Sequence, residues 1–183
     1  MHVRVVLWSV PLMPLIGTIE RFKLRSGVTK DNIAFVEGEL NTGEAMAIPV
    51  IKALKKRIDQ SKIVILDAPP GTSCPVIETI QETDVVLLVT EPTPFGLHDL
   101  KLAVEVVKTM GLPFGVIINR DGIGDDRVDI YCEKENIPIM LRIPHDRHIA
   151  ALYSKGVAFV TEISEMKQAF QELYKNISRM VKP

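Results

Sequence analysis

The chain has 183 residues, with 22 lysines and arginines against 23 aspartates and glutamates, so its formal net charge is −1 at pH 7. Hydrophobic residues make up 46% and charged residues 25% of the sequence, which excludes intrinsic disorder, a collagen-like repeat and a disulfide-rich scaffold. Proteins that bind nucleic acid usually have a basic excess, so this charge balance argues against a nucleic-acid partner.

The two cysteines, Cys74 and Cys132, have neither a CxxC spacing nor a Cys/His spacing typical of metal sites. Such usage is typical of a reducing cytoplasm, and two thiols are too few for an iron–sulfur cluster held by four. No apolar run approaches the ~18 residues that a membrane-spanning helix needs. An apolar stretch follows Arg4, but Pro11 and Pro14 interrupt it, which argues against a signal peptide. We expect a cytoplasmic protein with no membrane partner.

The N-terminal part of the chain has no clear hydrophobic period. Residues 1–36 contain short apolar pieces separated by Gly17, Gly27 and clustered charges, so we expect an irregular segment there and place a domain boundary after residue 36. Within this segment, residues 3–8 are a β-branched run that could form a strand. Residues 43–59 follow a helical pattern, with Pro49 as an imperfection.

From residue 63 onward, short apolar runs alternate with helical segments. Continuous apolar strands are typically buried on both faces, as in a parallel sheet covered by helices. The alternation predicts an α/β fold, a three-layer sandwich with a mostly parallel sheet and right-handed crossovers. We predict strands at 63–66, 85–89, 115–118 and 137–143, and helices at 96–110, 125–135, 147–154 and 163–181.

Ligands bind at the carboxyl ends of the strands in open parallel sheets, so the segments that follow the predicted strands are the candidate sites. Asp67 ends the first strand and could hold Mg²⁺, usually through water. After it, two prolines restrict the backbone of the loop and a glycine then allows it to turn, so that the amides of the loop can face a phosphate. These loop residues are Pro69, Pro70, Gly71 and Thr72. The alternative is a plain turn in which Asp67 is only a capping residue.

Polar loops also follow the other three predicted strands. The second loop is rigid because of its prolines and could expose Phe95 as a contact surface, or it could be a stiff structural turn. In the third, the amide of Asn119 both donates and accepts, so it can read a base edge such as that of adenine. The fourth contains Pro144 and Asp146. Each loop is a weak signal alone, but all four fall at the same end of consecutive strands.

Other common site types find no support in the sequence. Three of the four histidines, His98, His145 and His148, lack a partnered cysteine or carboxylate at metal-ligand spacing. No Ser-His-Asp or G-x-S-x-G arrangement is present.

Four segments of the sequence carry a resemblance to a known family: VILDAPPGTSCPVIETI, VVLLVTEPTPFGLHDLKLAVEVV, GVIINRDG and IPHDRHIAALYSKG. They resemble MinD/ParA-type P-loop ATPases, and more narrowly the members with an inserted ferredoxin domain, relatives of the Mrp/Nbp-type iron–sulfur carriers. The resemblance runs from about Glu37 to the C-terminus. It implies a P-loop NTPase-like fold that is incomplete at its N-terminus, with residues 37–183 as the nucleotide-binding domain. Residues 1–36 would be a remnant of the ferredoxin insert or a substitute strand.

The resemblance also implies roles for the candidate residues. Asp67 would be the catalytic Walker B carboxylate that supports Mg²⁺, and residues 69–72 would sense the γ-phosphate of ATP. Asn119 would contact the adenine of ATP or ADP, with Arg120 bracing it, while Pro144 and Asp146 would close over the base and ribose. Family members dimerise with nucleotide at the interface, which would lie near Glu91, Pro92, Pro94 and Phe95.

The chain departs from this family at the phosphate-binding loop. The only match to the spacing G-x-x-x-x-G-K-[ST] begins at Gly38, but Glu44 replaces the lysine and Ala45 replaces the hydroxyl residue. The ferredoxin cysteines are missing as well. Because phosphate-binding amides and the lysine stabilise the charge that develops in hydrolysis, we expect weak or no ATPase activity from this chain alone.

The departure also affects the predicted sheet. The missing first strand of the family is normally central, so its absence would leave two unpaired edges, and we hypothesise that residues 3–8 fill the gap.

Three functional interpretations remain open. The first is a truncated or split ATPase domain, the nucleotide-binding half-site of an iron–sulfur-associated ATPase with an iron–sulfur or redox client. The second is a non-catalytic module that pairs with a full-length homologue or with itself. The third is an amide-forming enzyme of the cobyrinic-acid-synthase type, although that enzyme also needs a P-loop. A gene fragment is a further alternative. Nucleotide binding would separate the first interpretation from the second.

Overall fold

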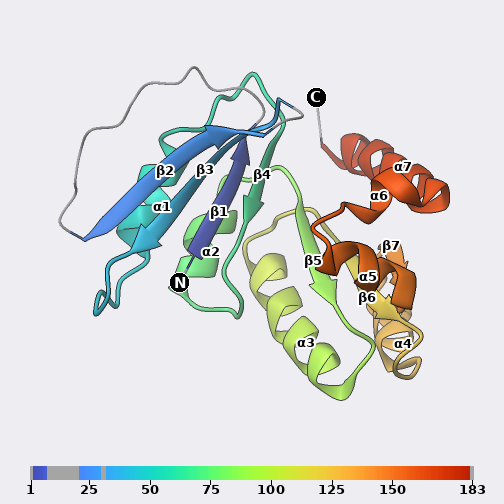
Figure 1. The fold of residues 1–183 in the computed structure, drawn as a ribbon. Coiled ribbons are helices and arrows are strands. Elements are labelled where there is room, and N and C mark those ends of the chain that lie inside the picture. The colour runs from blue at the N-terminus through green and yellow to red at the C-terminus, as the bar shows by residue number, and fades with distance from the viewer. Residues whose placement is uncertain (1, 8–20, 30–31, 182–183) are drawn as a thin grey trace. The chain divides into compact units, whose positions relative to one another are not determined.

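The structure is a computed structural model that describes residues 2–7, 21–29 and 32–181. The chain divides into two compact units, Met1–Gln81 and Glu82–Pro183. Each unit contains a sheet and the helices that pack on it (Figure 1). No helix among these residues is both long and apolar enough to cross a membrane.

The first unit is built on an antiparallel sheet with the strand order β2-β3-β1-β4. β1 lies between β3 and β4, and Val5 is opposite Val36 on one side and Leu66 on the other. The strands are β1 (His2–Leu7), β2 (Phe22–Val28), β3 (Ala34–Leu40) and β4 (Val64–Asp67).

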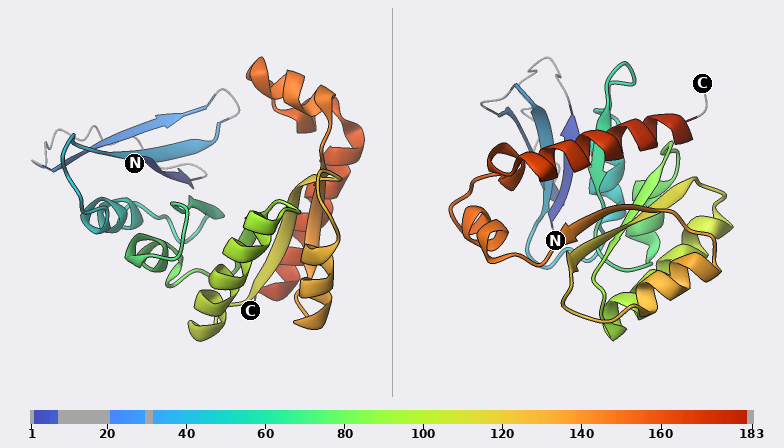
Figure 2. Two further views of the ribbon diagram at one scale, coloured as in Figure 1. Left: turned by 90° about the horizontal axis from the view of Figure 1, so that it is seen from below. Right: turned by 90° about the vertical axis from the view of Figure 1, so that its right-hand side faces the viewer.

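One face of this sheet packs on α1 (Ile48–Lys55), and α1 in turn contacts α2 (Cys74–Ile80). Both helices lie on the same side of the sheet in Figure 2. The inward side chains of β3 alternate along the strand, with Ala34, Val36 and Gly38 buried. They face the fully buried side chains of Val50 and Leu54 from α1. Pro49 lies in the first turn of α1, where backbone N–H groups have no acceptor within the helix, so the missing N–H of proline costs no hydrogen bond.

The strand expected at 63–66 is present as β4, but two expectations about it are wrong. It pairs antiparallel with β1 and is not part of the parallel sheet. It is also not buried on both faces, because Val64 and Leu66 pack on the core of the first unit whereas Ile65 is 63% exposed. Successive side chains of a strand point to opposite faces, and within the part of the chain that the structure describes α1 and α2 cover one face only.

The N-terminal segment contributes regular structure. β1 covers most of the run expected at 3–8, and Trp8 lies outside the described residues. β1 flanks β4, but it does not enter the parallel sheet of the second unit. The domain boundary drawn after residue 36 falls inside β3, whereas the compact units divide after Gln81. As the start of a nucleotide-binding domain, residue 37 stays a prediction.

The second unit is built on a parallel sheet with the order β5-β6-β7, which confirms the predicted α/β class. Its strands are β5 (Val86–Thr90), β6 (Phe114–Asp121) and β7 (Ile139–Pro144). Its helices are α3 (Pro94–Thr109), α4 (Arg127–Lys134), α5 (Arg147–Ser154), α6 (Phe159–Glu162) and α7 (Ser164–Met180).

Helices pack on both faces of this parallel sheet. Val116 and Ile118 of β6 are buried in a cluster with Val104 of α3 and Val128 of α4. Ile117, between them in sequence, points to the other face and joins a second cluster with side chains of β7 and α7. β6 is therefore buried on both sides, as its continuous apolar sequence predicts.

Candidate functional site at the carboxyl edge of the parallel sheet

The three parallel strands end in loops at one edge of the second unit. Because β5, β6 and β7 run in the same direction, the residues that follow them emerge side by side. We call these loops, together with the last residues of β6 and β7, the carboxyl-edge loops, and they comprise residues 91–93, 119–126 and 144–146. They contain the predicted site residues of this unit except Pro94 and Phe95, which begin α3.

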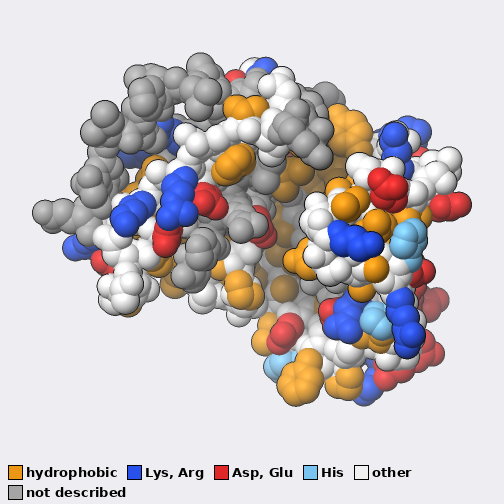
Figure 3. Space-filling model, in the orientation of Figure 1, with side chains coloured by type: hydrophobic (Ala, Val, Ile, Leu, Met, Phe, Trp, Pro, Cys, Tyr) orange, Lys and Arg blue, Asp and Glu red, His pale blue; other side chains and the backbone are white. Residues whose placement is uncertain are grey.

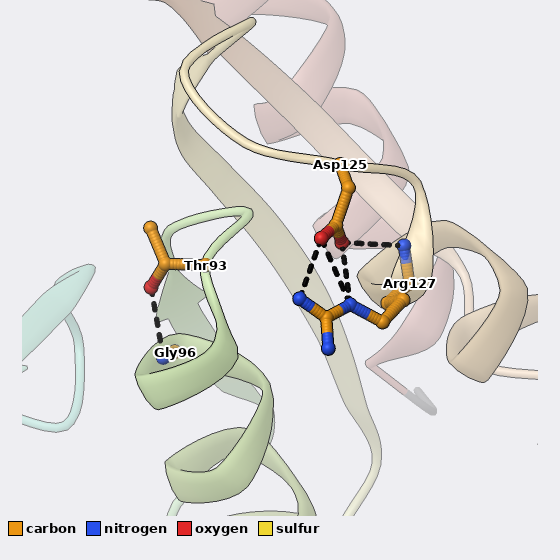
Figure 4. Close-up of polar contacts among 4 residues, drawn as sticks. All are labelled: Thr93, Gly96, Asp125 and Arg127. Atoms are coloured by element: carbon orange, nitrogen blue, oxygen red, sulfur yellow. Dashed lines mark hydrogen bonds and ion pairs between the residues drawn. The ribbon is translucent and has the colours of Figure 1, made fainter.

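The loop between β5 and α3 is held by hydrogen bonds to the first turn of the helix. Thr93 caps α3, since its Oγ1 accepts from the backbone N–H of Gly96 at 3.0 Å (Figure 4). The buried Thr90 donates its hydroxyl to the Gly96 carbonyl at 2.9 Å. A Cβ at Gly96 would lie only 2.2 Å from the Glu91 carbonyl oxygen, so the loop folds over a position that only glycine can occupy. This rigid turn leaves Phe95 84% exposed.

The end of β6 carries an irregularity at the predicted base-binding residues. The pairing register with β7 shifts between Ile118 and Asp121, and Arg120 has a left-handed backbone with φ of 54°. Bulges of this kind change the direction of side chains at the end of a strand. Asn119 is partly buried, whereas Arg120 is exposed, and its Nη1 lies 3.6 Å from Oε2 of Glu91. Arg120 thus contacts the neighbouring loop, whereas its expected role in bracing Asn119 stays a prediction.

The middle loop also contacts both of its neighbours through the backbone. The N–H of Asp125 donates to the Pro92 carbonyl at 3.3 Å, and the N–H of His145 donates to the Asp121 carbonyl at 2.8 Å. At the third loop, Asp146 caps α5, because its carboxylate accepts from the backbone N–H of His148. Pro144 and Asp146 are both exposed.

Two arginines that sequence reasoning did not assign to the site stabilise the middle loop. Arg127 donates from Nε and Nη2 to the Asp125 carboxylate at 2.6–2.9 Å, and these bonds lower the pKa of that carboxyl group (Figure 4). Arg142 on β7 contacts Asp129 of α4 and lies 3.6 Å from Asp121. The hydrogen bond to Asp129 is the main reason why the pKa of Arg142 is raised. In the sequence, the signal for a special role of Arg142 was that it is a lone arginine in an otherwise apolar strand.

The remaining predicted residues lie in the first unit. Asp67 ends β4 and is exposed. The following turn buries Pro69, exposes Pro70 and places Gly71 at φ of 94° before α2 begins. The left-handed backbone at Gly71 explains why glycine is needed there. One carboxylate at a strand end is compatible with Mg²⁺, which commonly takes one or two protein carboxylates beside phosphate oxygens.

The spacing that begins at Gly38 does not form a phosphate-binding loop. Gly38 is buried inside β3, where a Cβ would lie 2.3 Å from Cγ2 of Val50, so it belongs to a strand and not to a loop. Glu44 follows in the turn before α1 and lies 4.0 Å from Arg21. A carboxylate at this position repels phosphate. The P-loop-like spacing that begins at Gly38 is therefore a strand end followed by a turn.

An iron–sulfur cluster does not fit the described residues either. They contain no group of three or more His, Cys, Asp or Glu side chains that could hold a metal ion. Cys74 is exposed, whereas Cys132 is buried, and burial raises the pKa of its thiol.

The chain is similar to several archaeal proteins. It is 31% identical over 145 residues to an uncharacterized protein of Methanocaldococcus jannaschii, covering 78% of this chain and 50% of that protein. It is 25% identical over 154 residues to an iron–sulfur cluster carrier protein of Pyrococcus horikoshii, covering 73% and 52%. An uncharacterized ATP-binding protein of M. jannaschii is 28% identical over 123 residues, covering 63% and 46%. No family model matches the chain.

These similarities agree with the broad resemblance to iron–sulfur carrier proteins and ATP-binding proteins. The chain spans about half the length of the curated relatives it matches. That the chain corresponds to the C-terminal portion of such a protein stays a prediction.

Proposed function

We propose that the chain is the nucleotide-binding domain of a MinD/ParA-type ATPase of the iron–sulfur carrier group. In this proposal it binds ATP or ADP through the carboxyl-edge loops and hydrolyses ATP weakly or not at all by itself. The main support is the arrangement of Asn119, Arg120, Pro144 and Asp146 in loops that emerge at one edge of the parallel sheet. The named iron–sulfur carrier and ATP-binding relatives support the same assignment.

Base recognition is the role that the chain's own residues fit best. The partly buried amide of Asn119 can donate to a ring nitrogen of adenine and accept from its amino group. The neighbouring strand ends hold the loop in place through Glu91 and Arg142. Pro144 and Asp146 supply an apolar ring and a carboxylate beside this position, suited to the base and the ribose hydroxyls.

The chain supplies only some of the groups that would bind the phosphates of the nucleotide. Asp67 is the proposed carboxylate for Mg²⁺, which would supply positive charge to the phosphates when bound, and residues 69–72 are the proposed γ-phosphate loop. No lysine-containing glycine loop exists in this chain to stabilise the charge that hydrolysis develops. A separate segment or chain is therefore required for efficient turnover.

Nucleotide binding is tested by calorimetric titration with ATP, ADP and adenosine in the presence of Mg²⁺. Replacing Asn119→Ala should weaken binding about tenfold, because one or two hydrogen bonds to the base are lost. The matched control is Asn176→Ala on α7, whose side chain only accepts from Arg179. Saturable binding that is equally strong in both variants would contradict the base-binding role of Asn119. If the original chain did not bind nucleotide at millimolar concentration, the proposed function would be excluded.

A second function is favoured by the exposed aromatic side chain at the start of α3. Phe95 is 84% exposed on a rigid turn, and on the face drawn in Figure 3 apolar side chains reach the surface among charged ones. A rigid exposed aromatic residue is well suited to a protein interface. In this alternative the chain is a non-catalytic module that pairs with a full-length homologue or a second copy, and its client is an iron–sulfur or redox protein.

The pairing is tested by sedimentation velocity, with the chain alone and mixed with a homologue that has a P-loop. Phe95→Ala should weaken association about tenfold or more, as expected for an interface anchor. Tyr153→Ala on α5 is the control, because Tyr153 is similarly exposed at 82%. Chains that stay monomeric in every mixture, or an equal effect of both variants, would exclude this interface.

A further inference from the structure

The carboxyl-edge loops are linked to one another across the whole edge of the sheet. Glu91 pairs with Arg120 between the first and second loops, and the Pro92 carbonyl accepts from Asp125 at the same junction. The Asp121 carbonyl accepts from His145 between the second and third loops. Asn119, the proposed base-binding residue, is thus followed directly by residues that contact both neighbouring loops.

The junction between the first two loops has no room for an additional atom at Gly124. A Cβ at this position would lie 1.3 Å from the Pro92 carbonyl oxygen and 2.5 Å from the carbonyl carbon. A normal nonbonded separation would require the loops to move apart by roughly 2 Å. Such a movement would also break the hydrogen bond from Asp125 to Pro92.

The other end of the first loop is tied just as closely to α3. Thr93 holds the Gly96 amide, and the Glu91 carbonyl lies against Gly96 without room for a side chain. Residues 91–93 therefore cannot shift without moving the first turn of α3, which carries Phe95. The middle loop and the exposed aromatic side chain are two ends of one chain of contacts.

We propose that Gly124 and Glu91 are positioning residues that couple the base site at Asn119 to the exposed first turn of α3. Adenine bound at Asn119 then changes the position or mobility of Phe95, and with it the affinity for a partner. A partner bound at Phe95 changes the affinity for the nucleotide by the same factor. The identity of the ligand rests on the proposed function, whereas the mechanical link between the loops does not.

The two positioning residues differ in how strongly they link the loops. Glu91 and Arg120 form an ion pair in which both side chains are more than a third exposed, and exposed pairs of this kind are usually weak. The backbone contact at Gly124 is close and leaves no free space. Gly124→Ala should therefore disturb the link strongly, and Glu91→Gln should do so in the same direction but less.

The link is tested first without ligand, by amide hydrogen exchange measured by NMR. Gly124→Ala should speed exchange several-fold at Gly96 and Leu97 as well as at Asp125. Asp126→Asn is the matched control, since Asp126 is exposed in the same loop and its side chain makes no capping bond to α4. Exchange that rises only within residues 119–126 in the Gly124 variant would overturn the proposal.

A second pair of variants keeps the test decisive if Gly124→Ala does not fold. Protection of the core amides of Val116 and Ile118 reports whether the second unit is intact. Glu91→Gln should raise exchange at Gly96 and Leu97, and Glu91→Asp should restore most of the protection because it keeps the charge. Equal rates in these two variants and the original chain would overturn the role of Glu91.

The linkage to nucleotide is tested by titrating ADP and following backbone amide shifts. In the original chain, the amides of the non-proline residues in 93–97 should shift together with those of residues 119–126. In Gly124→Ala the middle loop should still respond while residues 93–97 no longer do, and an unchanged response at residues 93–97 would overturn the coupling. Failure of the original chain to bind ADP would overturn the proposed function, and the ligand-free exchange rates would still decide the link between the loops.

Discussion

Gly38 shows how a single small residue determines the packing of the first unit. A Cβ there would lie 2.3 Å from Cγ2 of Val50 and 3.3 Å from Cδ1 of Leu54, and both side chains are fully buried. The close approach of β3 to α1 leaves no free volume into which a methyl group could move. Glycine at this position therefore serves packing, although in the sequence it begins a spacing that imitates a phosphate loop.

Replacing Gly38→Ala should reduce the free energy of unfolding by about 1–3 kcal/mol, the usual cost of overpacking a core. Chemical denaturation followed by circular dichroism measures this change. Ser26→Ala on the neighbouring strand β2 is the control, since Ser26 is exposed and should change stability by less than about 0.5 kcal/mol. An alanine variant as stable as the original chain would show that α1 can move away from β3 at little cost.

Individual site residues were predictable only where their position near the end of a strand could be read from the sequence. Asn119 and Pro144 could be placed because Asn119 lies two residues before the end of β6 and Pro144 is the last residue of β7. Gly124 could not be placed, because its importance comes from a contact with Pro92 that no local pattern encodes. Arg142 stood out only as a charge in an apolar strand, and its contact with Asp129 is not encoded locally.

Among the elements, the helices of the second unit followed their sequence patterns closely. α3, α4, α5 and α7 lie within two residues of the expected bounds, because each has a periodic apolar face and a clear start or end. β3 was missed for an identifiable physical reason. Its buried face consists of Ala34, Val36 and Gly38, small residues that give almost no alternating hydrophobic signal.

The ends of α3 and α4 are joined by an ion pair whose contribution depends on pH. Lys108 donates to Glu135 at 2.7 Å, and this hydrogen bond lowers the pKa of Glu135 below its ordinary value of 4.5. A carboxylate with a lowered folded-state pKa stabilises the fold above its unfolded-state pKa. That contribution is lost as the pH falls from about 4.5 through the folded-state pKa.

Glu135→Gln should therefore lower the urea midpoint slightly at neutral pH, and the difference from the original chain should vanish in acid. Glu133→Gln on the same helix is the control, since Glu133 is exposed. Unfolding curves at several pH values follow the comparison. A difference that is the same at neutral and acid pH would mean that the ion pair does not stabilise the contact between α3 and α4.

At the scale of the whole molecule, the α/β class was predictable and the division into two sheets was not. The runs at 85–89, 115–118 and 137–143 are continuous and apolar, and they form the parallel sheet. The run at 63–66 has the same appearance but pairs with β1. Strand pairing between segments remote in sequence depends on the partner strand, and the composition of the run itself does not encode it.

The incomplete phosphate site leads to a prediction for the whole chain. ATP turnover should be far below that of ordinary P-loop ATPases, because neither unit contains a lysine-bearing glycine loop. A phosphate-release assay with Mg²⁺ and ATP measures this rate, with a P-loop-containing homologue as the positive control. Turnover comparable to that homologue, lost on Asp67→Ala, would contradict the half-site proposal.

The position of β1 has a consequence for the order in which the chain can fold during synthesis. β1 is made before β4, yet Arg4 of β1 pairs with Asp67 at the end of β4. The side of β1 that faces β4 therefore stays unpaired while β2, β3 and α1, which lie between them in the chain, are translated. The parallel strands of the second unit each pair with a neighbour in chain order, so its sheet can grow one crossover at a time.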